Sequence, residues 1–237
     1  MEILYRDDCL VAVHKPAGLL VHRSLIDKHA TDFALQRVRD QLGRRVYPVH
    51  RLDRPTSGVL LFALDAGTAR TLTAQFTAGQ VVKTYRAIVR GYLEPEGVID
   101  HALREELDVL ADANADPNKA PQTAITQFRR LATVELPFPV SRYPTARYSL
   151  VELQPQTGRK HQLRRHLKHI FHPIIGDTTH GDGRHNQFFA RHFANQRLLL
   201  AATRLQLRHP QTGEVLLIRA PLAADFQRIV AALGWDT

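Results

Sequence analysis

The sequence has little that would cross-link, anchor or export it. Cys9 is the only cysteine among 237 residues, which excludes an intramolecular disulfide. No apolar run approaches the ~18 residues of a membrane span. The first residues, MEILYRDDCLVAVHK, also lack the basic, apolar and cleavage regions of a secretory signal. We therefore expect a cytoplasmic protein in a reducing compartment, with no membrane partner.

The usual sequence marks of a cofactor or metal site are missing as well. There is no P-loop, no G-x-G-x-x-G fingerprint, no H-E-x-x-H and no cysteine cluster. Histidines gather only between residues 158 and 172, where five Lys or Arg accompany them and no acid occurs between Glu152 and Asp177. Such cationic neighbours repel a divalent ion. We predict neither a metal nor a cofactor, although His166 and His169 are spaced so that they could face together.

Lysine is scarce, but positive charge is not. Only six of the 32 basic residues are lysine and the rest are arginine, against 23 acidic residues, which leaves a net charge of +9. Guanidinium groups grip phosphates in a bidentate fork and stack on bases. The balance indicates a nucleic-acid partner, although charge alone is also compatible with a protein that is merely soluble.

Apolar spacing predicts more strands than helices. Strands are expected at 3–5, 9–15, 59–64, 83–92, 124–133, 148–153, 198–207 and 215–218. Helices are expected at 31–42 with Thr31 as its cap, at 69–76, at 158–172 and at 223–233. Residues 104–121 and the proline-rich segment ELPFPVSRYP are expected to be irregular. The order indicates an α+β protein with a mixed, mostly antiparallel sheet and flanking helices.

The segment HRLDRPTSG, residues 50–58, places Asp53 between Arg51 and Arg54 in a loop restrained by Pro55. The flanking guanidinium groups would stabilise its negative charge. Such a loop can hold a charged group still for chemistry. The alternative is an ordinary Asx-turn with a surface ion pair.

The segment GRKHQLRRHLKHIFH, residues 158–172, predicts a basic helix. Leu163, Leu167 and Ile170 follow helical spacing and would face the core. On the same spacing Lys160, Arg164 and Lys168 share another face, which would present charge to phosphates. The alternative is a solvated helix with a basic surface and no ligand.

Three of these segments resemble the signature of the large pseudouridine synthase family that includes the enzymes modifying ribosomal large-subunit RNA. HRLDRPTSG matches the segment whose aspartate is catalytic, and KTYRA the segment whose tyrosine packs on the target base. TGRKHQLRRHL matches the third, whose last arginine pairs with the catalytic aspartate. The resemblance thus implies the catalytic residues Asp53, Tyr85 and Arg164. It also places Leu163 beside the base and Arg51 in the helix space that the target nucleotide vacates.

The resemblance implies a pseudouridine synthase fold with a basic RNA-binding cleft, which isomerises uridine after flipping it out of the stack. Asp53 would attack C1′ of the nucleoside or remove a proton from C2′, and the sequence does not choose between these routes. No cofactor and no obligate protein partner are expected. The remaining predicted RNA-contacting residues are basic: Arg54, Arg159, Lys160, Arg165 and Lys168.

Within the family, the likeness is closer to members that modify uridine 65 of tRNA. VHRS, RYPTARYSLVEL and GDTTHGDGRHN carry it. We therefore expect tRNA as the partner and a single catalytic domain over residues 1–237, with no N-terminal RNA-binding domain. The alternatives are a ribosomal large-subunit RNA synthase and a non-catalytic RNA-binding or ribosome-assembly protein.

Overall fold

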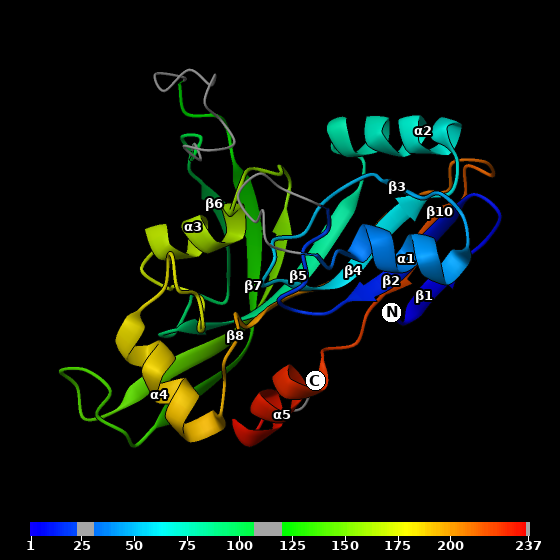
Figure 1. The fold of residues 1–237 in the computed structure, drawn as a ribbon. Coiled ribbons are helices and arrows are strands. Elements are labelled where there is room, and N and C mark those ends of the chain that lie inside the picture. The colour runs from blue at the N-terminus through cyan, green and yellow to red at the C-terminus, as the bar shows by residue number, and fades with distance from the viewer. Residues whose placement is uncertain (23–30, 107–119, 236–237) are drawn as a thin grey trace.

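One large sheet organises the chain (Figure 1). The computed structural model describes residues 1–22, 31–106 and 120–235. Within these ranges the main path of the sheet runs through β1 (Ile3–Arg6), β2 (Leu10–Lys15), β4 (Ser57–Ala63), β9 (Leu200–Arg208), β5 (Val82–Arg90), β8 (Ala146–Pro155), β7 (Ile125–Leu136) and β6 (Glu96–Asp100). Off this path, β10 (Val215–Arg219) pairs with β9 and β3 (Tyr47–Pro48) pairs with β4.

The strand pairs are antiparallel except where β4 meets β9. There Ser57 and Gly58 lie opposite Ala201 and Ala202 in parallel register. Gly58 has φ of +115°, and a Cβ on it would lie 2.0 Å from the carbonyl oxygen of Ala202. Only glycine allows this approach of two backbones. The predicted α+β class with a mostly antiparallel sheet is confirmed, and β4 is buried along its whole length as expected.

Helices cover both faces of the sheet. On one face lie α1 (Ala34–Leu42) and α3 (Gln162–His169), which pack on alternate residues such as Leu60 of β4 and Ala87 of β5. The intervening residues, such as Leu61 and Ile88, face α2 (Ala66–Thr77), α4 (Gly183–Phe193) and α5 (Ala224–Ala232). In Figure 1, α1 and α3 lie over different halves of the sheet. The strip between those halves is where the candidate site forms.

Several element predictions need correction. The first helix begins at Ala34 with Phe33 as its N-cap, so Thr31 does not cap it. The basic segment is helical only over Gln162–His169, because His161 before it adopts a left-handed backbone with φ of 54°. The helix α4 and the short strands β3 and β6 were not predicted.

Of the two segments predicted to be irregular, one can be compared with the structure along its whole length. The segment ELPFPVSRYP is irregular only after β7 ends at Leu136. Most of the predicted excursion at 104–121 lies outside the described residues. In the described part of the chain, no helix is long and apolar enough to cross a membrane.

Candidate active site

Asp53 sits in a tight turn directly ahead of β4. The N–H of Thr56 donates to the Asp53 carbonyl at 3.0 Å, and the carboxylate is 23% exposed. The turn packs against the segment after β2, where the Gly18 N–H donates to the Arg54 carbonyl at 2.8 Å. The backbone on both sides of the carboxylate is thereby fixed.

Lys15 is a buried cation that ties these two segments together. Its Nζ donates to the carbonyl oxygens of Pro16, Leu19 and Arg54 at 3.0, 2.6 and 3.1 Å. Burial lowers the pKa of Lys15 to about 7, although the negative charge of Asp53 acts in the opposite direction. Lys15 was not among the predicted site residues, and its place beside the turn of Asp53 makes it a positioning residue for that turn.

Arg164 joins Asp53 to a second, deeper carboxylate. Its Nε and Nη2 donate to the two oxygens of Asp177 at 2.7 and 2.8 Å, and its Nη1 reaches Oδ2 of Asp53 at 3.4 Å. The side chains of Arg164 and Asp177 are 6% and 1% exposed. Asp177 thus occupies one edge of the guanidinium and leaves the other nitrogen for Asp53.

Asp177 is itself set in place by its local backbone. Its Oδ1 accepts from the N–H groups of Thr179 and His180, each at 2.9 Å. Burial alone would raise the pKa of Asp177, but the hydrogen bonds from Arg164 and these N–H groups lower it below its usual 3.8. The preceding Gly176 is required, since a Cβ there would lie 1.8 Å from the Arg197 carbonyl oxygen. Asp177 was not among the predicted site residues, although the Gly-Asp pair after HPII was a visible signal.

Tyr85 lies on β5 between the halves of the sheet covered by α1 and α3, and it packs at the edge of both apolar clusters. Burial and the nearby charge of Asp53 raise the pKa of its phenol above the usual value. The ring is therefore a neutral, half-buried surface beside the carboxylate.

A histidine pair lies on the other side of Asp53. The Nε2 of His161 is 4.0 Å from Oδ2 of Asp53, and its Nδ1 is 3.2 Å from Oε2 of Glu106 and 3.1 Å from Nε2 of His180. Burial lowers the pKa of His161, an effect that Asp53 opposes and Arg164 reinforces. The predicted site residues included none of these three, His161, Glu106 and His180.

The expectation that no carboxylate lies near these histidines was wrong, because Glu106 contacts His161 across 55 residues of sequence. One ligand atom from each of Glu106, His161 and His180 lies within 4.8 Å of the others. Arg165 already pairs with Glu106 at 3.3 Å, and such a guanidinium competes with a cation. His166 is buried and bonded to Thr126 and the His101 carbonyl, so it does not pair with exposed His169.

The predicted RNA-contacting residues differ in how far their side chains are exposed. Exposed side chains belong to Arg51, Arg54, Arg159 and Lys168. Half-buried ones belong to Lys160, whose Nζ donates to the Glu106 carbonyl at 2.9 Å, and to Arg165. Leu163 is buried against the sheet. The predicted common face of Lys160, Arg164 and Lys168 is wrong, because Arg164 points inward to two carboxylates.

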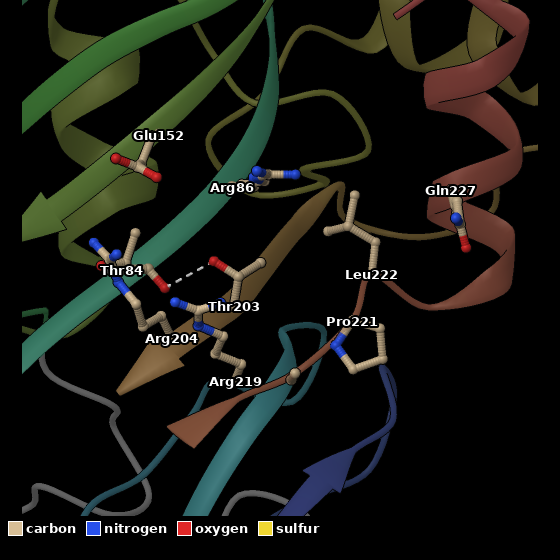
Figure 2. Close-up of a pocket in the computed structure, with 10 residues that line it drawn as sticks. Thr84, Arg86, Glu152, Thr203, Arg204, Arg219, Pro221, Leu222 and Gln227 are labelled. Atoms are coloured by element: carbon tan, nitrogen blue, oxygen red, sulfur yellow. Dashed lines mark hydrogen bonds between the residues drawn. The ribbon is translucent and has the colours of Figure 1, made fainter. Parts of the chain in front are cut away.

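The reverse face of the sheet holds a separate pocket of about 360 Å³ (Figure 2). Arg86, which follows Tyr85 on β5, lines it together with Arg204 and Arg219. Successive side chains of a strand point to opposite faces. This pocket is therefore not part of the site around Asp53.

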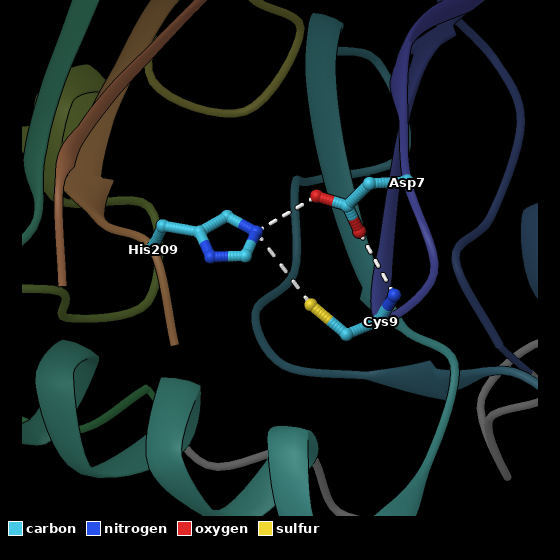
Figure 3. Close-up of side chains that lie close together, drawn as sticks. All are labelled: Asp7, Cys9 and His209. Carbon is cyan, nitrogen blue, oxygen red and sulfur yellow. Dashed lines mark hydrogen bonds and ion pairs between the residues drawn. The ribbon is translucent and has the colours of Figure 1, made fainter. Parts of the chain in front are cut away.

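A second cluster, Asp7, Cys9 and His209, links the β1–β2 turn to the turn after β9 (Figure 3). The Nε2 of His209 lies 2.8 Å from Asp7 and 3.6 Å from the sulfur of Cys9. Asp7 and Lys15 flank opposite ends of β2, so this cluster is remote from Asp53.

Known proteins are similar to this chain over most of its length. A family model described as RNA pseudouridylate synthase matches residues 9–169. The chain is 57% identical over 235 residues to a protein named tRNA pseudouridine synthase C from Pectobacterium carotovorum subsp. carotovorum, covering 99% of this chain and 62% of that protein. It is 54% identical over 236 residues to the protein of that name from Vibrio cholerae serotype O1, covering 100% of this chain and 97% of that one.

A solved structure has the same fold. The human RNA Pseudouridylate Synthase Domain Containing 4 aligns with a TM-score of 0.73 at 28% identity, covering 100% of this chain and 94% of that one. The resemblance that the sequence segments indicated is confirmed. This chain belongs to the RNA pseudouridylate synthase family of isomerases.

Proposed function

We propose that this protein converts uridine to pseudouridine in tRNA, at position 65 in the T-arm region, with Asp53 as the carboxylate that attacks the flipped-out nucleoside. The observation that carries the proposal is the arrangement around Asp53, where a fixed turn presents the carboxylate and the Asp177-bound guanidinium of Arg164 reaches it at 3.4 Å. The names of the two bacterial relatives support tRNA as the substrate. We expect the reaction to take place in the cytoplasm, where tRNA is found.

The reaction breaks the bond from C1′ to N1 of uracil and forms one from C1′ to C5. A carboxylate suits the first step, since it can attack C1′ or take a proton from C2′ to give a glycal. Arg164 would keep Asp53 charged in a site closed by the target base. Tyr85, neutral and half-buried, would offer its ring to that base.

The exposed arginines around the Asp53 turn are suited to RNA. Arg51 and Arg54 flank the carboxylate, and both are exposed. We expect Arg51 to fill the space left by the flipped nucleotide and Arg54 to contact phosphate. Binding should therefore weaken steeply as salt rises.

The test is tritium release from 5-[³H]uridine transcripts of tRNA and of ribosomal fragments, followed by mapping of the modified position. Wild-type protein should release one equivalent from tRNA, and Asp53→Asn should fall below roughly 1% of that rate because the anionic oxygen is lost. Conversion of the ribosomal fragment but not of tRNA would support pseudouridine formation as the reaction and would contradict tRNA as the substrate. Measurable turnover by Asp53→Asn would overturn the role of Asp53.

The two routes for Asp53 can be separated with deuterium at C2′ of the target uridine. Removal of the C2′ proton breaks a C–H bond, so the glycal route predicts a primary isotope effect on single-turnover rates. Direct attack on C1′ leaves that bond intact and predicts only a small secondary effect.

A further inference from the structure

We infer that His161 is the general base that removes the proton from C5 of the rearranged uracil, and that Glu106 fixes the ring in the form this requires. The inference rests on the proposed function and adds a step to it. It follows from the placement of one imidazole between the catalytic carboxylate and a second acid.

The chemistry demands such a base. Once uracil has rejoined the sugar through C5, that carbon carries both C1′ and its original hydrogen. A base takes the proton, the C–H electron pair forms the C5–C6 double bond, and the electrons of the C6–N1 double bond move to N1, which gains a proton. One proton leaves C5 and one arrives at N1, so the step is redox-neutral and needs no co-reactant.

His161 is within reach of that carbon. Reacting atoms lie roughly 3–3.5 Å apart in a near-attack geometry, which fixes C1′ close to Asp53. Nε2 of His161 lies 4.0 Å from the same carboxylate oxygen. Once the C1′–C5 bond has formed, C5 of the uracil therefore lies close to both Asp53 and His161.

The surroundings of the ring select its useful tautomer. Nδ1 lies 3.2 Å from the carboxylate of Glu106 and 3.1 Å from Nε2 of His180. A carboxylate only accepts hydrogen bonds and a neutral imidazole nitrogen can accept one, so both contacts are satisfied when Nδ1 carries the hydrogen. Nε2 then keeps its lone pair on the side of Asp53. Glu106 is held in turn, by Arg165 at 3.3 Å through Oε1 and by Lys160 at 2.9 Å through its backbone oxygen. This is the relation of a base to the group that orients it.

Other groups beside Asp53 are less suited to this step. Tyr85 holds its phenolic proton, because burial and Asp53 raise its pKa. Lys15 donates hydrogen bonds to three carbonyl oxygens, and Arg164 remains charged, so neither has a lone pair that could accept a proton. Burial also lowers the pKa of His161, which favours the neutral ring that a base requires.

The test compares uridine with 5-fluorouridine at the target position. Fluorine cannot leave C5 as a cation, so 5-fluorouridine RNA reacts only as far as the C1′–C5 bond. We choose His161→Asn because asparagine tolerates the left-handed backbone, with φ of 54°, at this position. Single-turnover pseudouridine formation should fall by roughly 10²-fold or more, the usual contribution of a general base. Consumption of 5-fluorouridine RNA should stay within about threefold of wild type.

Deuterium at C5 gives an independent readout. In His161→Asn the slowed proton removal should produce a larger primary isotope effect than in wild type. Glu106→Gln should show the same pattern with a smaller loss, roughly tenfold, because the ring is present but its tautomer is no longer fixed. His169→Asn, an exposed histidine of the same helix, is the matched control and should change neither rate.

Equal slowing on both substrates would show that His161 only positions Asp53, and would overturn the inference. Unchanged uridine turnover would overturn it as well. Asp53→Asn should stop both substrates, which separates the two roles. If wild-type protein converted no uridine, the proposed function and this inference would fall together.

Discussion

Among the described residues, two clusters that each bring a histidine against a carboxylate differ in whether the second ring nitrogen is engaged. At Glu106 and His161, one ring nitrogen meets the acid and the other lies 4.0 Å from Asp53, beyond hydrogen-bond distance. At Asp7 and His209, Nε2 lies 2.8 Å from the acid and Nδ1 accepts from two backbone N–H groups, of Gln211 and Thr212.

The acid of the second cluster is just as fully engaged. Asp7 accepts from the N–H groups of Cys9 and Leu10 and from the hydroxyl of Tyr5. The same residue types, a histidine and a carboxylate, therefore have different roles in the two clusters. A ring whose nitrogens are both engaged holds two turns together, whereas a ring with a free lone pair beside a carboxylate can take part in a reaction.

Arg164→Met should have the largest effect on activity and stability, because it removes both the contact with Asp53 and the buried ion pair with Asp177. Activity should be lost, and Asp177 would remain buried and unpaired, which costs on the order of 3–5 kcal/mol of the free energy of unfolding. Denaturant melts and tritium release measure the two effects separately.

A second substitution sharpens this result. Asp177→Asn added to Arg164→Met removes the unpaired charge but still accepts from the Thr179 and His180 N–H groups. Stability should recover in part while activity stays lost. Recovery of activity would contradict the assignment of Arg164 to the reaction.

Asp7→Asn should show the opposite pattern, a loss of stability with turnover unchanged. Weakening the hydrogen bonds of this half-buried acid should cost about 1–3 kcal/mol of the free energy of unfolding. Burial acts to raise the pKa of Asp7, but the hydrogen bonds from Cys9, His209 and Leu10 lower it far below 3.8.

The sign of that shift predicts a pH dependence. Because the folded-state pKa is depressed, the stabilisation is fully present above pH 3.8 and is lost as the pH falls toward the folded value. The difference in unfolding free energy between wild type and Asp7→Asn should narrow below that pH. Asp8→Asn, an exposed neighbour, is the control. A difference that grew in acid would contradict the shift.

Lysines of the basic segment should differ in RNA binding. Lys168 is exposed on α3, whereas the ammonium of Lys160 donates to the Glu106 carbonyl. Lys168→Gln should reduce the slope of log affinity against log salt by about one unit if it contacts a phosphate, with a smaller change for Lys160→Gln. Filter binding to tRNA over a salt series checks both. Equal slopes for the two variants would mean that Lys160 leaves its carbonyl partner on binding RNA.

Cys9→Ala should have the smallest effect. Burial and Asp7 raise the pKa of the thiol to about 12, so no reactive thiolate forms near neutral pH. Turnover should be unchanged, and stability should fall by about 1 kcal/mol for one buried sulfur. Iodoacetamide should not modify the folded protein. Rapid alkylation would show that the cluster of Asp7, Cys9 and His209 opens readily.

The sequence alone identified much of the sheet and the location of Asp53. Strands such as β4 carry a continuous apolar run, and β5 alternates residues for two covered faces, so local spacing was enough to find them. The helix α4 was missed because its apolar residues cluster at Phe188, Phe189 and Phe193 instead of repeating regularly, although Asp182 caps it.

The composition of the site was decided by the tertiary structure. Helical spacing shows which residues share a face but not what that face meets, so spacing alone placed Arg164 on a charged surface. The family resemblance paired it with Asp53, and in the structure two carboxylates hold it inward. Arg164 and Asp53 are 111 residues apart, and Glu106 and His161 are 55 apart. Local sequence determined which side chains could carry charge, and the pairing of distant strands determined which of those charges meet. Such meetings are needed because a charge that is buried without a partner strongly destabilises the folded state.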